Sequence, residues 1–169
     1  MEATMRLVDA VIAELDQEAD ATRRVLERIP EDKLSWRPHR KSMSLGQLAL
    51  HIATTPGGVA AIAAMDSVEA PDFARPEPGS KAEVLDALEQ SLRSARAFLH
   101  NLDDERAGAP WSLTRAGKPV FTVPRIGLVR TVMLNHWYHH RGEMCVYLRL
   151  LDVPVPAIYG PSADENPFA

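Results

Sequence analysis

Four long segments of the chain place apolar residues at alternating three- and four-residue steps, and this spacing constrains the fold more than any other feature. Such a period puts apolar side chains on one face of an α-helix, whereas a half-buried strand needs strict alternation. The segments are residues 2–29, 44–65, 80–102 and 125–151. The sequence therefore predicts an all-α fold in which four helices pack their apolar faces into a bundle.

Capping residues and one proline set the limits of the middle helices. Ser44 is followed three residues later by Gln47, which is the spacing of a capping box, so we expect a helix to begin there. Ser80 and Glu83 repeat the same spacing at the start of the next segment. Pro56 lies inside the second segment with two glycines after it, and we expect it to kink or weaken that helix.

Proline-rich stretches form the long connections and the C-terminal tail. One of them contains the run KPVFTV at 118–123, which has a strand-like composition but is too short and isolated to predict a strand. The proline-rich residues 152–169 predict an extended tail on the surface. We expect residues 1–169 to form a single helical domain.

Composition and charge exclude several classes of protein. Hydrophobic residues make up 46% of the chain and charged residues 25%, which excludes wholesale disorder. The net charge of −4 argues against a nucleic-acid partner, because neutralising phosphates needs a basic face. The longest run of small and apolar residues, 57–65, is much shorter than the roughly 20 residues that a bilayer requires. We therefore expect no membrane partner.

Two further features indicate the compartment. Charged residues interrupt the first segment, which therefore lacks the apolar core of a signal peptide. The chain has one cysteine, Cys145, so it has no internal disulfide, as is typical of proteins in a reducing compartment. These features predict a cytoplasmic protein.

The last predicted helix carries the candidate chemistry. At 100° per residue, His140 and Glu143 lie within about 40° of His136 around the helix axis, and His139 lies about 60° from it. Apolar residues share this face, so we expect the polar groups to lie inside the core stripe, paired or bound. Imidazoles four residues apart can reach one metal ion. The same pair also fits one histidine bonded to a backbone carbonyl and one facing solvent.

A third histidine lies on the apolar stripe of the second predicted helix. If that helix faces the last one, His51 approaches His136 and His140. Three neutral imidazoles suit a borderline divalent ion and leave a coordination position open, as in a reactive rather than a structural site. Taken alone, His51 also fits a histidine that is satisfied within the core.

Two stretches of the chain resemble the DinB-like (DinB/YfiT) superfamily. They are SLGQLALHIA at 44–53 and NHWYHHRGEMCVYLRLLDVPVPAIYGPSADE at 135–165. The family has a histidine in helix two and an H-x-x-x-H-R-G-[QE] signature in helix four. The matching positions here are His51, His136, His140, Arg141, Gly142 and Glu143. The resemblance implies an up-down-down-up four-helix bundle, often a homodimer, that binds zinc or nickel through the three histidines.

The resemblance also implies a class of reaction. Characterised members include S-transferases and a maleylpyruvate isomerase that use low-molecular-weight thiols. We therefore expect a metal-dependent enzyme that activates a thiol or water for transfer to, or hydrolysis of, a small molecule. Glu143 replaces the common glutamine, and it is a candidate for proton transfer, for orienting a ligand or for binding the metal. The alternative is a non-catalytic, stress-associated homodimer that sequesters a metal or a small ligand.

Three more residues are candidates for a pocket beside the histidines. His139 is close to one turn from His136, Thr55 follows His51 by one turn, and Trp36 precedes the second predicted helix. Each also fits a simpler role. His139 then covers a helix contact, Trp36 caps the end of the bundle, and the segment around Thr55 fits its helix to a neighbour.

Overall fold

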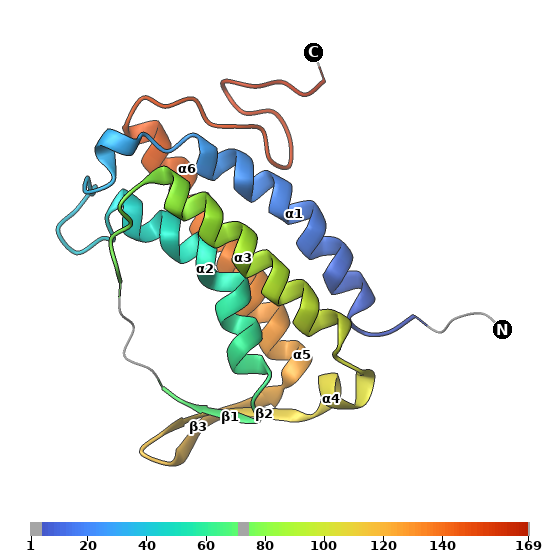
Figure 1. The fold of residues 1–169 in the computed structure, drawn as a ribbon. Helices are drawn as coiled ribbons and strands as arrows, with labels where there is room; N and C mark the ends of the chain where they lie inside the picture. The colour runs from blue at the N-terminus through green and yellow to red at the C-terminus, as the bar shows by residue number, and fades with distance from the viewer. Residues whose placement is uncertain (1–4, 71–74, 169) are drawn as a thin grey trace.

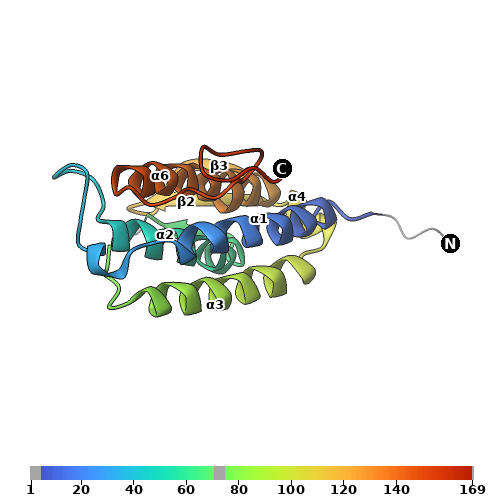
Figure 2. The same ribbon diagram turned by 90° about the horizontal axis from the view of Figure 1, so that it is seen from above.

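The fold is described by a computed structural model, which covers residues 5–70 and 75–168. Helices make up most of these residues, and α1 and α6 run in one direction while α2 and α3 run in the other (Figure 1). In Figure 2, α3 and α6 lie on opposite sides of α1 and α2. The long helices are α1 (Asp9–Glu27), α2 (Leu45–Ala63), α3 (Lys81–His100) and α6 (His136–Leu150).

The last predicted helix is continuous, but it changes geometry along its length. It begins with α5 (Arg125–Leu128), continues as a π-helical segment (Val129–Asn135) and ends as α6. The first predicted helix begins later than expected, at Asp9, and residues 2–4 of that prediction lie outside the described residues. Two short helical elements lie in the connections, a 3-10 turn (Glu31–Lys33) and α4 (Asp104–Gly108).

A small sheet at one end of the helices contradicts the expectation of a purely α fold. β1 (Ser67–Glu69) pairs in parallel with β2 (Pro110–Arg115), which pairs antiparallel with β3 (Lys118–Pro124). The run at 118–123, for which the sequence predicts no strand, is therefore part of β3. Most of β3 is exposed, so it shows no apolar alternation, and the pairing of β1 with β2 joins residues far apart in the chain.

Capping bonds start α2 as predicted and α3 only in part. Ser44 Oγ accepts from the backbone N–H of Gln47 at 3.1 Å, and Gln47 Oε1 accepts from the N–H of Ser44 at 3.0 Å, which completes the capping box. At α3, Ser80 Oγ accepts from the N–H of Glu83 at 3.1 Å. The carboxylate of Glu83 accepts instead from Gly79 N–H at 2.6 Å, so the second box is only half formed.

α2 continues through Pro56, because neighbouring helices bond the backbone groups that the proline disturbs. Proline has no N–H for the carbonyl four residues earlier, which belongs to Ile52. The indole Nε1 of Trp137 in α6 donates to that carbonyl at 2.9 Å. The N–H of Gly57 donates to Ser91 Oγ in α3 at 2.7 Å. The expected weakening of the helix is thus compensated from two sides.

Hydrogen bonds join the end of the molecule that carries the sheet to the C-terminal end of α2. Arg125 is 1% exposed, and its Nη1 donates to the carbonyls of Ala63 and Met65 at 3.1 and 2.9 Å. Trp111, also buried, donates from Nε1 to the carbonyl of Ile62 at 3.0 Å. These side chains bond carbonyls at and just after the C-terminal end of α2, where the helix leaves acceptors free for other partners.

Residues 152–168 contain no helix or strand and lie along α1 and α6 (Figure 1). Arg24 donates to the carbonyl of Ala157 at 2.7 Å, and Arg28 donates to that of Pro154 at 3.0 Å. Glu165 pairs with Arg28 as well. The tail is therefore held by the basic side chains at the end of α1.

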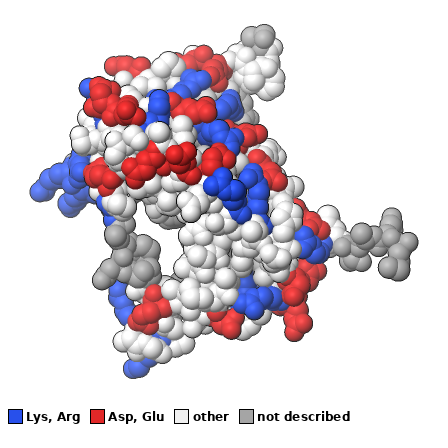
Figure 3. Space-filling model, viewed as in Figure 1, with Lys and Arg blue, Asp and Glu red and all other residues white. Residues whose placement is uncertain are grey.

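The surface carries charges of both signs. On the face in Figure 3, acidic and basic side chains surround an uncharged area over α2 and α3. Across residues 5–70 and 75–168, the helices are all too short or too polar to cross a membrane.

Candidate metal centre

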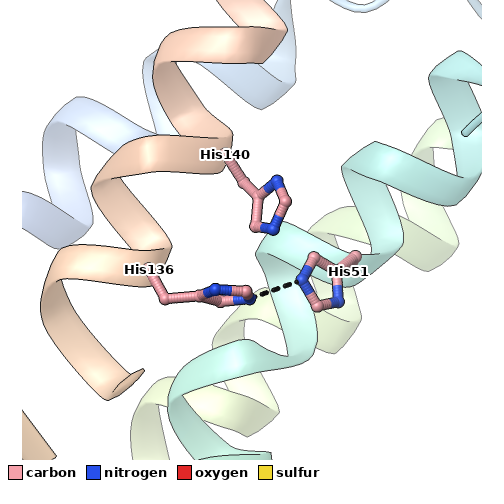
Figure 4. A group of neighbouring side chains, drawn as sticks. All are labelled: His51, His136 and His140. Carbon is pink, nitrogen blue, oxygen red and sulfur yellow. Dashed lines mark hydrogen bonds between the residues drawn. The ribbon is translucent and has the colours of Figure 1, made fainter. Parts of the chain in front are cut away.

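Three histidine side chains from α2 and α6 converge on one point (Figure 4). The Nε2 atoms of His51 and His136 are 3.0 Å apart. The ring centroid of His140 lies 4.5 Å from that of His51 and 4.4 Å from that of His136. Each ring offers one nitrogen, and these nitrogens all lie within 4.8 Å of one another. The structure thus brings together the three residues that the sequence assigns to a metal.

The spacing of the nitrogens fits a shared divalent ion. Two nitrogens bonded to one tetrahedral ion, at zinc's usual bond lengths, lie about 3.3 Å apart. The 3.0 Å between His51 and His136 differs from this by a few tenths of an ångström. The nitrogens of His51 and His136 are therefore spaced as two ligands of one ion would be, and the nitrogen of His140 lies within 4.8 Å of both.

Burial favours the neutral form of His51 and His136. Burial, followed by the proximity of His140 and His136, lowers the pKa of His51 from 6.5 to about 4. Burial and the proximity of His140 also lower the pKa of His136. A neutral imidazole keeps the nitrogen lone pair that binds a metal, so both rings are ready to act as ligands at neutral pH.

Glu143 orients the third histidine. Its Oε2 lies 2.6 Å from Nδ1 of His140. A carboxylate only accepts hydrogen bonds, so Nδ1 carries the proton and Nε2 keeps the lone pair that a metal needs. The other carboxylate oxygen, Oε1, lies 3.4 Å from Nε2 of His139. Glu143, His139 and His140 also form a second group with metal-ligand spacing, although the His139 side chain is 64% exposed.

The histidine face of α6 lies at the edge of the core rather than inside it. The rings of His136 and His140 are only partly buried, and so is that of His51. The expectation that these groups lie within the apolar stripe is therefore wrong. The π-helical segment shifts residues 129–135 relative to α6, so a helical wheel drawn at 100° per residue does not apply across both. The fully buried face of α6 consists of Trp137, Arg141, Met144 and Leu148.

A small cavity opens beside His51. Its volume is about 110 Å³, and it is lined by Gln47, Leu50, His51, Thr54, Arg75 and Pro76. The three predicted pocket residues do not line this cavity. Thr55 Oγ1 donates to the carbonyl of His51 at 2.6 Å, and Trp36 packs edge-on against Tyr147, with ring centroids 5.7 Å apart. His139 faces solvent beside Glu143.

The residue pattern does not predict the contacts of two buried residues, each of which follows a histidine of the cluster. Trp137 follows His136 and bonds α2, as described above. Arg141 follows His140 and is 2% exposed, and its Nη2 lies 2.6 Å from Glu18 Oε2 in α1. The same guanidinium donates to the hydroxyl of Tyr159 in the tail. The H-R-G signature contains Arg141, but its sequence position alone does not show which partners it meets.

Comparison with known proteins gives matches along most of the chain. The sequence profile of the DinB superfamily matches residues 14–144, a range that contains all three histidines. The protein YrdA of Bacillus subtilis (strain 168) is 25% identical over 161 residues, which cover 94% of this chain and 91% of YrdA.

Solved structures of DinB-like proteins share the fold. One from Bacillus cereus ATCC 10987 has a TM-score of 0.69 and 22% identity, covering 87% of this chain and 94% of that chain. YjoA from Bacillus subtilis has a TM-score of 0.68 and 20% identity, covering 89% of this chain and 97% of its own. At these identities the likeness is one of fold.

Proposed function

The chain belongs to the DinB superfamily, and on that premise we propose that it is a metal-dependent enzyme that acts on a small molecule. In this proposal His51, His136 and His140 hold one divalent ion, zinc or nickel. The observation that carries it is the 3.0 Å approach of the Nε2 atoms of His51 and His136, which are 85 positions apart in the sequence.

A bound divalent ion lowers the pKa of a thiol or a water, which makes it a nucleophile at neutral pH. The chain supplies the remaining parts. The three imidazoles are only partly buried, so the centre lies near the surface, and Glu143 fixes the proton of His140 on Nδ1. The cavity beside His51 gives space for the second reactant. Glu143 is also the carboxylate that we assign to proton transfer.

We propose the finer properties on the same premise. The chain forms a single up-down-down-up four-helix bundle over residues 1–169 and acts in the cytoplasm as a homodimer. Its nucleophile is a low-molecular-weight thiol or water, and neither a nucleic acid nor a membrane is its partner. The directions of the long helices in Figure 1 support the bundle.

One observation favours a second candidate, a non-catalytic homodimer that sequesters a metal or a small ligand. Both oxygens of Glu143 already face histidines, Oε2 towards His140 and Oε1 towards His139. A carboxylate engaged in this way orients a ligand well but is a weaker candidate for a mobile base. The binding role needs the same three histidines and no proton transfer.

Metal content tests both candidates. Protein purified without an affinity tag or chelator is expected to contain close to one divalent ion per chain, measured by elemental analysis. His136→Ala removes one ligand and is expected to lose the ion. His100→Ala, at the exposed end of α3, is the matched control and keeps it. Protein without metal, and without binding that depends on His136 in a titration, would contradict the enzyme and the sequestration of a metal.

Turnover separates the enzyme from the binding protein. The metal-loaded protein is mixed with bacterial low-molecular-weight thiols and model electrophiles, and product formation is followed by mass spectrometry. Turnover that disappears in His51→Ala supports the enzyme and excludes the binding role. Protein that binds metal stoichiometrically but shows no turnover with any thiol or with water favours sequestration.

A further inference from the structure

The cavity beside His51 carries a cationic side chain as well as the histidine that faces the metal centre. Arg75 lines this cavity together with Thr54 and the amide of Gln47, while Leu50 and Pro76 form apolar parts of the wall. Neither the three-histidine centre nor Glu143 accounts for an arginine at this place. Its position in the same cavity as His51 indicates a role in recognising what binds there.

The start of α2 fixes the segment that carries Arg75. The Nε2 of Gln47 donates to the backbone carbonyl of Arg75 at 2.8 Å, while its Oε1 completes the capping box with Ser44. Ser44 Oγ donates to Glu77 Oε2 at 2.7 Å, two residues further along the same segment. The backbone at 75–77 is therefore anchored to the first turn of α2, one to two turns before His51. Hydrogen bonds to α2 therefore hold the segment that carries Arg75 in place.

Among the described residues, the charges around the cavity do not compete with an anion for Arg75. Glu77, the acidic neighbour on the same segment, is engaged by Ser44 and lies 3.5 Å from Arg37. Within residues 5–70 and 75–168, we find no carboxylate paired with the guanidinium of Arg75. Arg75 and His51 line the same cavity, so a molecule bound there lies next to both side chains.

We propose that this cavity binds the carboxylate of a small organic acid, with Arg75 as the residue that determines specificity. A guanidinium presents a planar pair of N–H donors that matches a carboxylate. A volume of about 110 Å³ accommodates a carboxylate with a few carbon atoms, and the apolar walls of Leu50 and Pro76 suit a short carbon chain better than an inorganic anion.

The carboxylate site would give the proposed enzyme its substrate class, and it rests on the proposed function only for the orientation of the bound acid. Only the metal centre gives a reason for the far end of the acid to point towards His51, where it would meet the activated thiol or water. The binding of the carboxylate by Arg75 does not itself need the ion. The two ideas can therefore fail separately.

Weak binding of this kind is measured by titration in two-dimensional ¹H–¹⁵N spectra of the full chain. Propionate is the probe, propionamide is its uncharged analogue, and inorganic phosphate is the competing anion. Each is added to wild-type protein, to Arg75→Gln and to Arg75→Lys. Arg93→Gln removes the same charge from an exposed position on α3 and is the matched control.

Propionate is expected to shift the amide signals of residues around Thr54 in the wild type and in Arg93→Gln, and propionamide is not. Its dissociation constant is expected to rise about tenfold or more in Arg75→Gln, because one charge-assisted contact is lost. Arg75→Lys keeps the charge without the planar pair and is expected to fall between the two.

Three results would overturn the proposal. They are equal binding of propionate by wild type and Arg75→Gln, equal binding of propionamide, and tighter binding of phosphate than of propionate. Titration of both metal-loaded and chelator-treated protein separates this failure from that of the proposed function. Protein that holds no metal but binds propionate through Arg75 contradicts the centre alone, whereas metal binding without the Arg75 effect contradicts the carboxylate site alone.

Discussion

Glu143 reaches the three-histidine centre through His140 rather than directly. Its 2.6 Å bond to Nδ1 holds the ring in one orientation and one tautomer. Residues that hold a ligand histidine in this way contribute to metal affinity without contacting the ion. The carboxylate of Glu143 also places a negative charge beside His140 and His139. Its main effect is therefore expected on affinity.

Glu143→Ala is expected to weaken zinc binding about 10- to 100-fold, because His140 loses the partner that fixes its ring. Glu143→Gln keeps an oxygen acceptor and is expected to lose much less. A competition titration against a chromophoric chelator measures both. Glu105→Ala, an exposed acidic residue in α4, is the control for a change of net charge. Unchanged affinity in Glu143→Ala would show that the bond has no orienting role.

At this scale the sequence predicts the three histidines of the centre and misses the partners of Arg141 beside it. His136 and His140 are four residues apart in one α-helix, so their proximity follows from helix geometry alone. His51 lies on the face of α2 that meets α6. Arg141 is different, because its partners Glu18 and Tyr159 come from α1 and the tail. No periodicity within α6 contains that information.

Side chains from several other elements bond the backbone of α2. α3 and α6 each contribute one side chain to its proline turn. Ser91 Oγ accepts from the N–H of Gly57, and Trp137 Nε1 donates to the carbonyl of Ile52. Arg125 and Trp111 bond the carbonyls at its C-terminal end. The position of His51 is therefore set by contacts on both sides of its helix.

The bond from Trp137 to Ile52 is expected to matter only while Pro56 is present. Trp137→Phe leaves a buried carbonyl without a donor and is expected to lower the free energy of unfolding by about 1–3 kcal/mol beyond the change in packing. In a Pro56→Ala background, the new backbone N–H reaches the same carbonyl, so the loss becomes smaller. Urea denaturation of the four proteins gives the coupling, and a coupling of zero would contradict this account.

Two adjacent glycines in α2 are expected to behave oppositely. A Cβ on Gly57 would lie 2.9 Å from Ser91 Cα, so Gly57→Ala must push α3 away and is expected to cost about 1–3 kcal/mol. A Cβ on Gly58 meets nothing within 4 Å, and Gly58→Ala is expected to stabilise the helix by roughly 0.4–1 kcal/mol. Thermal denaturation compares the pair. Equal effects would show that α2 and α3 do not pack as closely as described.

For the whole molecule, the amphipathic pattern predicts which segments are helical but not how the sheet closes one end. The spacing of apolar residues and the capping box of Ser44 are local signals, and they give the limits of α2 and the approximate extent of α1, α3 and α6. β1 meets β2 only because the helices between them return to the same end. The strands are short and mostly exposed, so their sequence carries little sign of the pairing.

The proposed homodimer is tested on the intact chain. Sedimentation velocity at micromolar concentration is expected to give a species of about twice the chain mass of 18.7 kDa. A dilution series shows whether that species dissociates. A single species at the mass of one chain across the series would contradict the dimer and leave the metal centre unaffected.

His51 and His136 meet in space although 85 positions separate them along the chain. Bringing such distant points together costs loop-closure entropy, and here the packing of the helices provides the compensation before any ligand arrives. An unfolded chain offers no equivalent cluster, so an ion that prefers three converging imidazoles binds the native state selectively and shifts the unfolding equilibrium towards it. Metal affinity would thus depend on the folding of the whole chain, because unfolding of either half separates the three histidines.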